Sequence, residues 1–315
     1  MNYVFGPVPS RRLGMSLGID IVPFKTCTLD CIYCQLGVTT NKSIRREAFV
    51  PKNEVLNEIR QVLDKESDRI DFITFSGSGE PTLNSEIGDM IEEIKSFATI
   101  PIAVLTNGTL LYRDDVRKDL SKADLVVPSL DALTKQAFLK VNRPHESLNA
   151  EKILEGLKKF AEEYKGKIWL EIMIVRGIND DPEELKNLAD FLRKLKLDKI
   201  HLNTVVRPPA EEIASPVTLE EMQTIAELFD ERVEIIADFN KIKPSYSRQS
   251  YTSFEERIIS LLRRRPCTID DISSSLFIHI NEAIKYTNHL LENGLIRRVR
   301  RGDKWYYEDS SKEER

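Results

Sequence analysis

The sequence predicts an α/β protein, with a partial (β/α)6 barrel followed by a small winged helix-turn-helix domain. Strand-like apolar runs alternate with amphipathic helical patterns over most of the chain, as in βα units with parallel strands. Polar and glycine-containing segments follow these runs, and α/β barrels place their active sites at that end of the strands. We therefore expect function at this rim.

The barrel strands are predicted in chain order, each ending at a polar segment. The strand candidates span residues 16–22, 71–76, 102–106, 125–129, 169–175, 199–205 and 233–237. Helical patterns separate them, for example at residues 52–63 and 149–164. The segments at the strand ends are SGSGEPT, TNG, SLDA, VRGIND and NTVVRPP.

The composition changes at residues 243–253, which are rich in Ser and Tyr and poor in large aliphatic residues. This change predicts two domains, residues 1–244 and residues 245–315. The second domain is expected to contain helices at 254–264, 269–274 and 281–292, then two strands joined at Gly302 and Asp303. That order is typical of a winged helix-turn-helix.

Overall composition excludes several classes of protein. The chain has 315 residues, of which 41% are hydrophobic, so it is no disulfide miniprotein, collagen or mostly disordered chain. Its net charge of -5 gives no dominant field, and any nucleic-acid affinity must come from a local patch. The sequence has no signal-peptide pattern and no run of about 18 apolar residues. We expect a cytoplasmic protein without a membrane partner.

Three of the four cysteines lie within eight residues: Cys27, Cys31 and Cys34. Clustered thiols favour a metal site, because a disulfide would leave one of them unpaired and intracellular thiols stay reduced. Structural zinc is an alternative, but all four histidines are remote in sequence and no fourth ligand is near. Cys267 stands alone and is expected to be a buried thiol.

The spacing Cys27-x3-Cys31-x2-Cys34, with Tyr33 before the last cysteine, resembles that of the radical SAM superfamily. The resemblance covers roughly residues 10–240. It implies one 4Fe-4S cluster held by these three thiolates, with the fourth iron open to the amino and carboxylate groups of S-adenosylmethionine.

The strand-end segments resemble, in the same order, those that contact S-adenosylmethionine in this superfamily. In SGEP, where Ser78 replaces the family's first glycine, Glu80 is expected to meet the methionine ammonium. Arg143 is expected to pair with the methionine carboxylate, and Tyr33 to lie near the adenine. The implied contacts are Tyr33, Gly79, Glu80, Thr106, Asn107, Ser129, Asp131, Arg143 and Val175.

Each of these residues also has an ordinary structural interpretation. Gly77 and Gly79 fit a tight turn, Asn107 fits a loop cap, and Arg143 fits a surface ion pair. Asn203 and Arg207 project from the end of a later strand, where they would face adenine or substrate.

The resemblance also implies the chemistry. An external donor, flavodoxin or ferredoxin-like, reduces the cluster, and S-adenosylmethionine is cleaved to methionine and a 5'-deoxyadenosyl radical that abstracts hydrogen. We expect the cluster to be sensitive to oxygen. No residue identifies itself as a catalytic hydrogen or proton donor, so the catalytic residues remain unassigned by the sequence.

The opening segment, residues 5–14 (FGPVPSRRLG), resembles a radical SAM group related to the wyosine-forming tRNA synthases. Arg11 and Arg12 in this segment would bind phosphate or a substrate carboxylate, or would be solvated charges. The wyosine enzymes carry a second cluster from cysteines upstream of the motif, and this sequence has none before Cys27. We expect a single cluster.

The C-terminal domain carries a basic hairpin with Arg297, Arg298, Arg300, Arg301 and Lys304. Three aromatic residues follow at positions 305–307, and Lys285 and His289 lie on the expected recognition helix. This pattern favours a nucleic acid, with peptide or protein docking and a structural role as alternatives. The leading hypothesis is radical SAM modification of tRNA. The alternatives are a peptide, protein or small-molecule substrate, or an iron–sulfur regulator that binds DNA.

Overall fold

The computed structural model describes residues 3–206, 209–237, 253–276, 278–301 and 304–310. The chain divides into two units, one of residues 6–237 and one of residues 1–5 and 238–315. The predicted boundary at residue 244 lies outside the described residues, as do Arg207, Gly302 and Asp303. A parallel sheet builds the larger unit, and helices with a hairpin build the smaller one.

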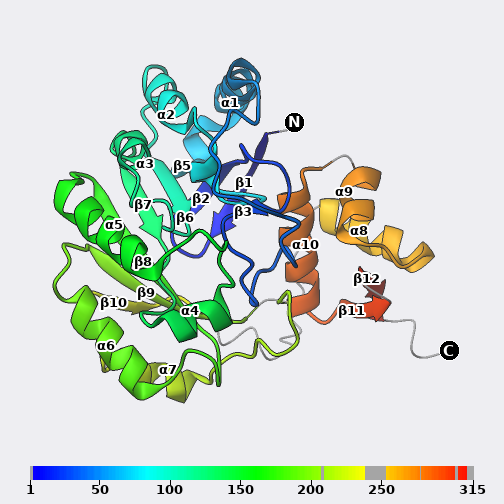
Figure 1. Cartoon of the computed structure of the whole chain (residues 1–315). Coiled ribbons are helices and arrows are strands. Elements are labelled where there is room, and N and C mark those ends of the chain that lie inside the picture. Colours follow the sequence, from blue (N-terminus) through cyan, green and yellow to red (C-terminus); the bar gives the residue numbers. More distant parts are fainter. Residues whose placement is uncertain (1–2, 207–208, 238–252, 277, 302–303, 311–315) are drawn as a thin grey trace. The chain divides into compact units, whose positions relative to one another are not determined.

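The sheet has the order β1-β2-β5-β6-β7-β8-β9-β10, and from β2 to β10 all neighbours are parallel (Figure 1). Residues 72–75 and 125–128, in the middle of the sheet, are almost entirely apolar, as expected when both faces of a parallel sheet are covered. This mixed α/β fold with a parallel sheet agrees with the prediction and is consistent with a partial barrel. The strands are β1 (Val4–Ser10), β2 (Gly14–Ile19), β5 (Phe72–Phe75), β6 (Ile102–Thr106), β7 (Leu125–Pro128), β8 (Lys167–Ile174), β9 (Lys199–Thr204) and β10 (Val233–Ile235).

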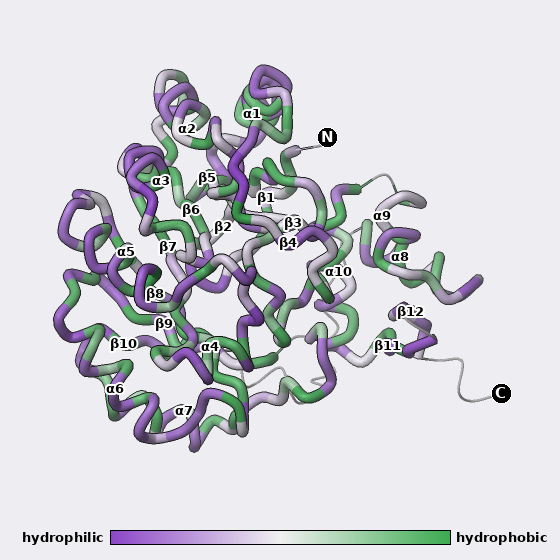
Figure 2. Tube along the Cα trace, viewed as in Figure 1, coloured by the Kyte–Doolittle hydropathy of each residue, from purple (hydrophilic) through white to green (hydrophobic). Residues whose placement is uncertain are grey.

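Helices connect successive strands and lie on the outside of the sheet (Figure 1). Hydrophobic and hydrophilic residues alternate along them (Figure 2); in α1 the buried side chains Val55, Leu56, Ile59 and Val62 follow a helical spacing. The helices are α1 (Lys52–Glu66), α2 (Ile87–Lys95), α3 (Asp114–Leu120), α4 (Lys135–Val141), α5 (Ala150–Glu163), α6 (Pro182–Leu192) and α7 (Leu219–Ala226). Short elements complete the unit: β3 (Thr26–Cys27), β4 (Asn41–Lys42), η1 (Ser67–Arg69) and η2 (Pro81–Leu83).

The predicted strands coincide with β2 and β5 to β10 to within a few residues, but the prediction missed β1. The sequence of β1 contains Pro7 and Pro9, and proline argues against a central strand because it cannot donate a ladder hydrogen bond. β1 is an edge strand, where proline is tolerated.

The smaller unit contains three helices followed by an antiparallel hairpin, in the predicted order. Its elements are α8 (Ser253–Arg264), α9 (Ile269–Leu276), α10 (Ile280–Glu292), β11 (Ile296–Arg301) and β12 (Lys304–Asp309). Its own apolar core includes Ile258, Leu262, Leu290 and the thiol of Cys267, which is fully buried as expected. None of the described helices of the chain is long and apolar enough to cross a membrane.

Arg46 joins the segment that follows the cysteine loop to η2 and α3. Its guanidinium donates to the carbonyls of Thr82 and Asn84, at 2.8 and 3.1 Å, and pairs with Asp115 and Asp119 of α3. The side chain is only 6% exposed. Removing one partner from such a buried network leaves uncompensated charges and acceptors.

We predict that Arg46→Ala lowers the free energy of unfolding by about 3 kcal/mol. Arg113→Ala is the matched control, because Arg113 pairs with the same Asp115 but its side chain is 35% exposed. The control should cost less than about 1 kcal/mol. Urea denaturation of the two variants measures the difference, and equal losses would contradict this account of the segment.

Candidate functional site

The three clustered cysteines lie on one loop that starts at the end of β3. Cys27 is the last residue of β3, and Cys31 and Cys34 follow in the loop. Leu29 and Ile32 bury their side chains in an apolar cluster with residues of α4, and the N–H of Ile32 donates to the last carbonyl of α4 at 3.0 Å. The loop is thus anchored by backbone and apolar contacts, and the three cysteines are partly buried.

Each of the three sulfurs lies beside a side-chain nitrogen that donates to it. Such donors fix the orientation of a metal ligand and stabilise negative charge on sulfur. The pairs are Asn107 Nδ2 with Cys27 Sγ at 3.4 Å, Asn142 Nδ2 with Cys31 Sγ at 3.3 Å, and Lys25 Nζ with Cys34 Sγ at 4.0 Å.

The thiols fit an iron–sulfur cluster better than a single metal ion. Burial raises the pKa of Cys27 to about 12 and that of Cys31 well above its ordinary value, so a bound cation is needed to stabilise the thiolates. Among the described residues, no three His, Cys, Asp or Glu side chains are close enough to hold one ion, as structural zinc requires. A cubane cluster takes each thiolate on a different iron.

Glu80 is buried, and both of its carboxylate oxygens accept hydrogen bonds. One carboxylate oxygen accepts from the N–H and hydroxyl of Thr82 and from the hydroxyl of Thr106, at 3.0, 2.6 and 2.6 Å. The other oxygen accepts from the N–H of Asn107 at 2.7 Å. Burial raises the pKa of Glu80. Glu80 therefore ties the segment after β5 to the segment after β6, and its contact with the methionine ammonium remains a prediction.

Asp131 plays a similar part after β7. Its carboxylate accepts from the hydroxyl of Tyr33, from Asn142 Nδ2 at 2.6 Å and from the N–H of Met173 at 2.8 Å. Burial raises its pKa to about 6. Because Asn142 also donates to Cys31, Asp131 orients a residue that touches the cluster ligand.

Gly79 is required by a close approach of two backbones. A Cβ at this position would lie 1.8 Å from the carbonyl oxygen of Thr26, the residue before Cys27. The N–H of Glu80 donates to the same oxygen at 3.0 Å. Any side chain at position 79 would therefore push the glycine-rich segment away from the cysteine loop.

Arg143 and Val175 make polar contacts within the chain, and Val175 is buried in the same apolar cluster as Leu29 and Ile32. Arg143 pairs with Glu211 at 3.0 Å, as in its ordinary structural interpretation, and its backbone has a φ of 44°. The N–H of Val175 donates to the side chain of Asn179 at 2.7 Å, and its carbonyl accepts from the N–H of Ile178 at 3.1 Å. Contacts of these two residues with S-adenosylmethionine remain predictions.

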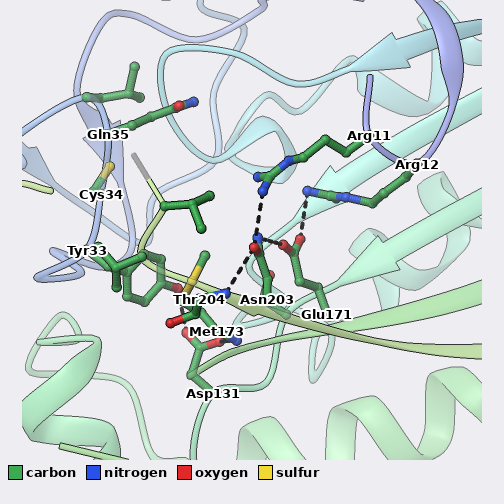
Figure 3. A pocket seen from close by; sticks show the side chains of 14 residues that line it. Arg11, Arg12, Tyr33, Cys34, Gln35, Asp131, Glu171, Met173, Asn203 and Thr204 are labelled. Carbon is green, nitrogen blue, oxygen red and sulfur yellow. Dashed lines mark hydrogen bonds and ion pairs between the residues drawn. The ribbon is translucent and has the colours of Figure 1, made fainter. Parts of the chain in front are cut away.

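A pocket of about 250 Å³ opens beside the cysteine loop (Figure 3). Tyr33 and Cys34 line it on the loop side, Ser129 and Asp131 at the end of β7, and Asn203 on β9. Predicted contacts from the loop and from two strand ends thus meet around one cavity.

Motif spacing in the sequence missed several residues of this site. Lys25 is 3% exposed and has a φ of 63°, and Asn142 follows α4 outside any motif. Glu171 lies in the middle of an apolar strand, and its alternation with Trp169 and Met173 on β8 was its only sequence signal. Motif spacing finds residues that touch a ligand directly, whereas these residues act through tertiary neighbours.

We predict that Asn142→Leu lowers the midpoint potential of the bound cluster, because the donor that stabilises added negative charge near Cys31 is lost. Iron content should remain that of the wild type. Asn187→Leu, on the exposed side of α6, is the control and should leave the potential unchanged. A potentiometric titration followed by EPR measures this, and equal potentials in all three proteins would contradict the proposed role of Asn142.

Comparison with known proteins agrees with the geometry. The "GTPase Obg" of Brachyspira hyodysenteriae is 37% identical over 294 residues, covering 93% of this chain, but this chain spans only 43% of that protein. A UPF0026 protein of Methanocaldococcus jannaschii is 34% identical over 313 residues, covering 98% of this chain and 96% of that protein.

More distant matches share the fold or part of the sequence. A "probable dual-specificity RNA methyltransferase" of Thermotoga sp. is 27% identical over 202 residues, covering 60% of this chain and 55% of that protein. The crystal structure of a radical SAM methyltransferase from Sphaerobacter thermophilus has a TM-score of 0.56 at 16% identity, covering 70% of this chain and 66% of that chain.

The family model agrees with these matches. The radical SAM superfamily model matches residues 21–192, more than half of the chain and including all three clustered cysteines. The chain therefore belongs to the radical SAM superfamily, whose members are enzymes that use a 4Fe-4S cluster and S-adenosylmethionine, and it is related to the UPF0026 proteins.

Proposed function

We propose that this radical SAM enzyme modifies a macromolecule, with tRNA as the favoured substrate, and that the smaller unit is a winged helix that recruits it. The single observation that carries the radical chemistry is the cysteine loop, in which each thiol has its own side-chain N–H donor. When bound, the cluster supplies the electron that cleaves S-adenosylmethionine to methionine and a 5'-deoxyadenosyl radical.

The residues of the chain have distinct tasks in this proposal. Cys27, Cys31 and Cys34 hold the cluster, and the residues that donate to their sulfurs stabilise its charge. Tyr33 and Ser129 line the pocket where S-adenosylmethionine and substrate would meet. The apolar cluster around Leu29 and Ile32 excludes water beneath the loop. An external electron donor, flavodoxin or ferredoxin-like, and a cytoplasmic location are part of the proposal.

The hairpin of the smaller unit supports a nucleic-acid partner. The Arg298 guanidinium stacks 3.7 Å from the Trp305 ring centre, and Arg300 lies 5.9 Å from the same ring. A guanidinium next to an aromatic face suits phosphates and unstacked bases. A distant relative whose name includes RNA methyltransferase adds support, although its identity to this chain is only 27%.

Three side chains of the predicted basic footprint pair with carboxylates of the same unit. Arg297 and Arg301 pair with Glu308, and His289 of α10 with Glu255. The expected footprint on α10 is therefore weaker than the sequence indicates. The nucleic-acid contact is assigned to the hairpin face that carries Arg298, Arg300 and Trp305, and a peptide partner is the competing outcome.

We predict that the anaerobically reconstituted chain forms 5'-deoxyadenosine from S-adenosylmethionine when reduced with dithionite. Replacing Cys27, Cys31 or Cys34 by Ala should abolish both 4Fe-4S assembly and this product, because each thiolate is one of only three cluster ligands. Cys267→Ala is the matched control and should spare both, since Cys267 is buried in the smaller unit. A full cluster without Cys31 would overturn the ligand assignment.

We predict that the full chain binds bulk tRNA and that Trp305→Ala weakens this binding roughly 5- to 100-fold, through loss of a stacking surface. Arg257→Gln is the control, because Arg257 is an exposed arginine of α8 in the same unit and lies over the ring of Phe254. Filter binding at several salt concentrations gives the affinities. Absence of tRNA binding, or equal affinities for wild type and Trp305→Ala, would contradict the RNA proposal.

A further inference from the structure

Lys25 is a buried lysine beside the last of the three clustered cysteines. The residue is only 3% exposed, and no other lysine of the described residues is buried. Its ammonium lies 4.0 Å from Cys34 Sγ and donates to the carbonyl of Gly37, three residues further along the same loop. The end of the cysteine loop is therefore packed against a positive charge that has been taken out of water.

The backbone holds Lys25 in an unfavourable conformation. Its φ of 63° lies in the left-handed region, which residues with a Cβ rarely adopt. The N–H of Lys25 donates to the carbonyl of Ser78 in the glycine-rich segment at 2.7 Å, and its carbonyl accepts from the N–H of Asn41 in β4 at 3.1 Å. Because these bonds fix the direction in which the side chain leaves the backbone, the conformation points to a role for that side chain.

The surroundings of the Lys25 ammonium fit a site whose resident group is anionic. Among the described residues, the ammonium contacts the Gly37 carbonyl and the Cys34 sulfur, and no carboxylate pairs with it. A buried ammonium is costly to desolvate unless an anion compensates its charge. The neutral carbonyl cannot supply that charge, whereas a thiolate at Cys34 can.

The other two sulfurs have the opposite electrostatic surroundings. After burial, the strongest opposition to a thiolate at Cys27 comes from the Glu80 carboxylate, and at Cys31 from the Asp131 carboxylate. The side-chain donors described above for these two sulfurs are neutral amides. Of the three donors, the one at Cys34 is therefore the one that carries a charge. Cys34 also lines the pocket beside the loop (Figure 3).

We propose that Lys25 is a positioning residue that sets the redox potential of the cluster, through the effect of its charge on the Cys34 thiolate. One electron passes from the external donor, which is oxidised, to the cluster, which is reduced and becomes more negative by one charge. A fixed positive charge in a buried site stabilises that added charge more than a neutral amide does. Lys25 thus lets the donor deliver its electron at a less negative potential. This inference rests on the proposed function, because it requires the cluster on the three clustered cysteines.

The test is a potentiometric titration, followed by EPR, of the full chain with its reconstituted cluster, without S-adenosylmethionine. Lys25→Gln removes the charge but keeps an N–H donor for the Gly37 carbonyl. It should lower the equilibrium constant for one-electron reduction roughly tenfold or more, which lowers the midpoint potential by at least about 59 mV. Lys25→Arg keeps the charge and should change the constant by less than about threefold.

Two further variants separate the buried charge from other effects. Lys42→Gln is the matched control, because Lys42 pairs with Cys27 in the β3–β4 ladder but has an exposed side chain whose charge is screened by water. It should change the constant by less than about threefold. Asn142→Leu, which removes a neutral donor from Cys31, should lower the potential less than Lys25→Gln does.

Three results would overturn this role: equal potentials in the wild type and Lys25→Gln, an equal fall in Lys42→Gln, or a fall in Lys25→Arg as large as that in Lys25→Gln. The last result would assign Lys25 to packing of the loop. If Lys25→Gln assembles no cluster, assembly becomes the readout. Normal assembly in Lys25→Arg then supports the role of the charge, and loss of assembly in both variants overturns it.

Failure of the proposed function is distinguishable from failure of this inference. A wild-type chain that holds no 4Fe-4S cluster would overturn both. A wild-type chain that forms 5'-deoxyadenosine, together with a Lys25→Gln variant of unchanged potential, would overturn the role of Lys25 alone.

Discussion

The buried carboxylate of Glu80 is the interaction on which the geometry of the site depends. It accepts four hydrogen bonds, from Thr82, Thr106 and Asn107, and so holds together the segments that follow β5 and β6. The side chain of Asn107 then reaches Cys27 Sγ. A buried carboxylate is costly unless its oxygens are satisfied, and here each of its donors comes from a residue of the rim. These hydrogen bonds offset the desolvation cost of the charge, and the carboxylate in turn holds Asn107, which donates to Cys27.

Asp131 has a similar positioning role in the segment that follows β7. It orients Asn142, which donates to Cys31, and it accepts from Tyr33 within the cysteine loop itself. Two carboxylates after different strands of one parallel sheet thus position two of the three thiols. Residues at the carboxyl ends of the strands thus position the cysteine loop, which has little regular secondary structure of its own.

Hydrophobic periodicity predicted the parallel sheet, because its strands are mainly apolar runs that alternate with amphipathic helices and end at polar segments. It missed β1, whose prolines are compatible only with the edge position that the strand takes in the fold. The spacing of Cys27, Cys31 and Cys34 indicated the cluster, because three ligands that are close together in the sequence can lie on a single loop. The sequence placed Glu80 and Asp131 at the rim but could not reveal that their oxygens are taken by neighbours. Lys25 and Asn142 escaped prediction because their roles come entirely from tertiary contacts.

The central claim is that three thiolates hold a 4Fe-4S cluster whose fourth iron is open to S-adenosylmethionine. Mössbauer spectroscopy of the full chain reconstituted with 57Fe tests it most directly, with spectra recorded before and after S-adenosylmethionine is added. The account predicts that the signal of one iron in four changes on addition, while the other three keep the parameters of thiolate-bound cluster sites. Spectra of a 2Fe-2S cluster, or a 4Fe-4S spectrum that S-adenosylmethionine leaves unchanged, would contradict it.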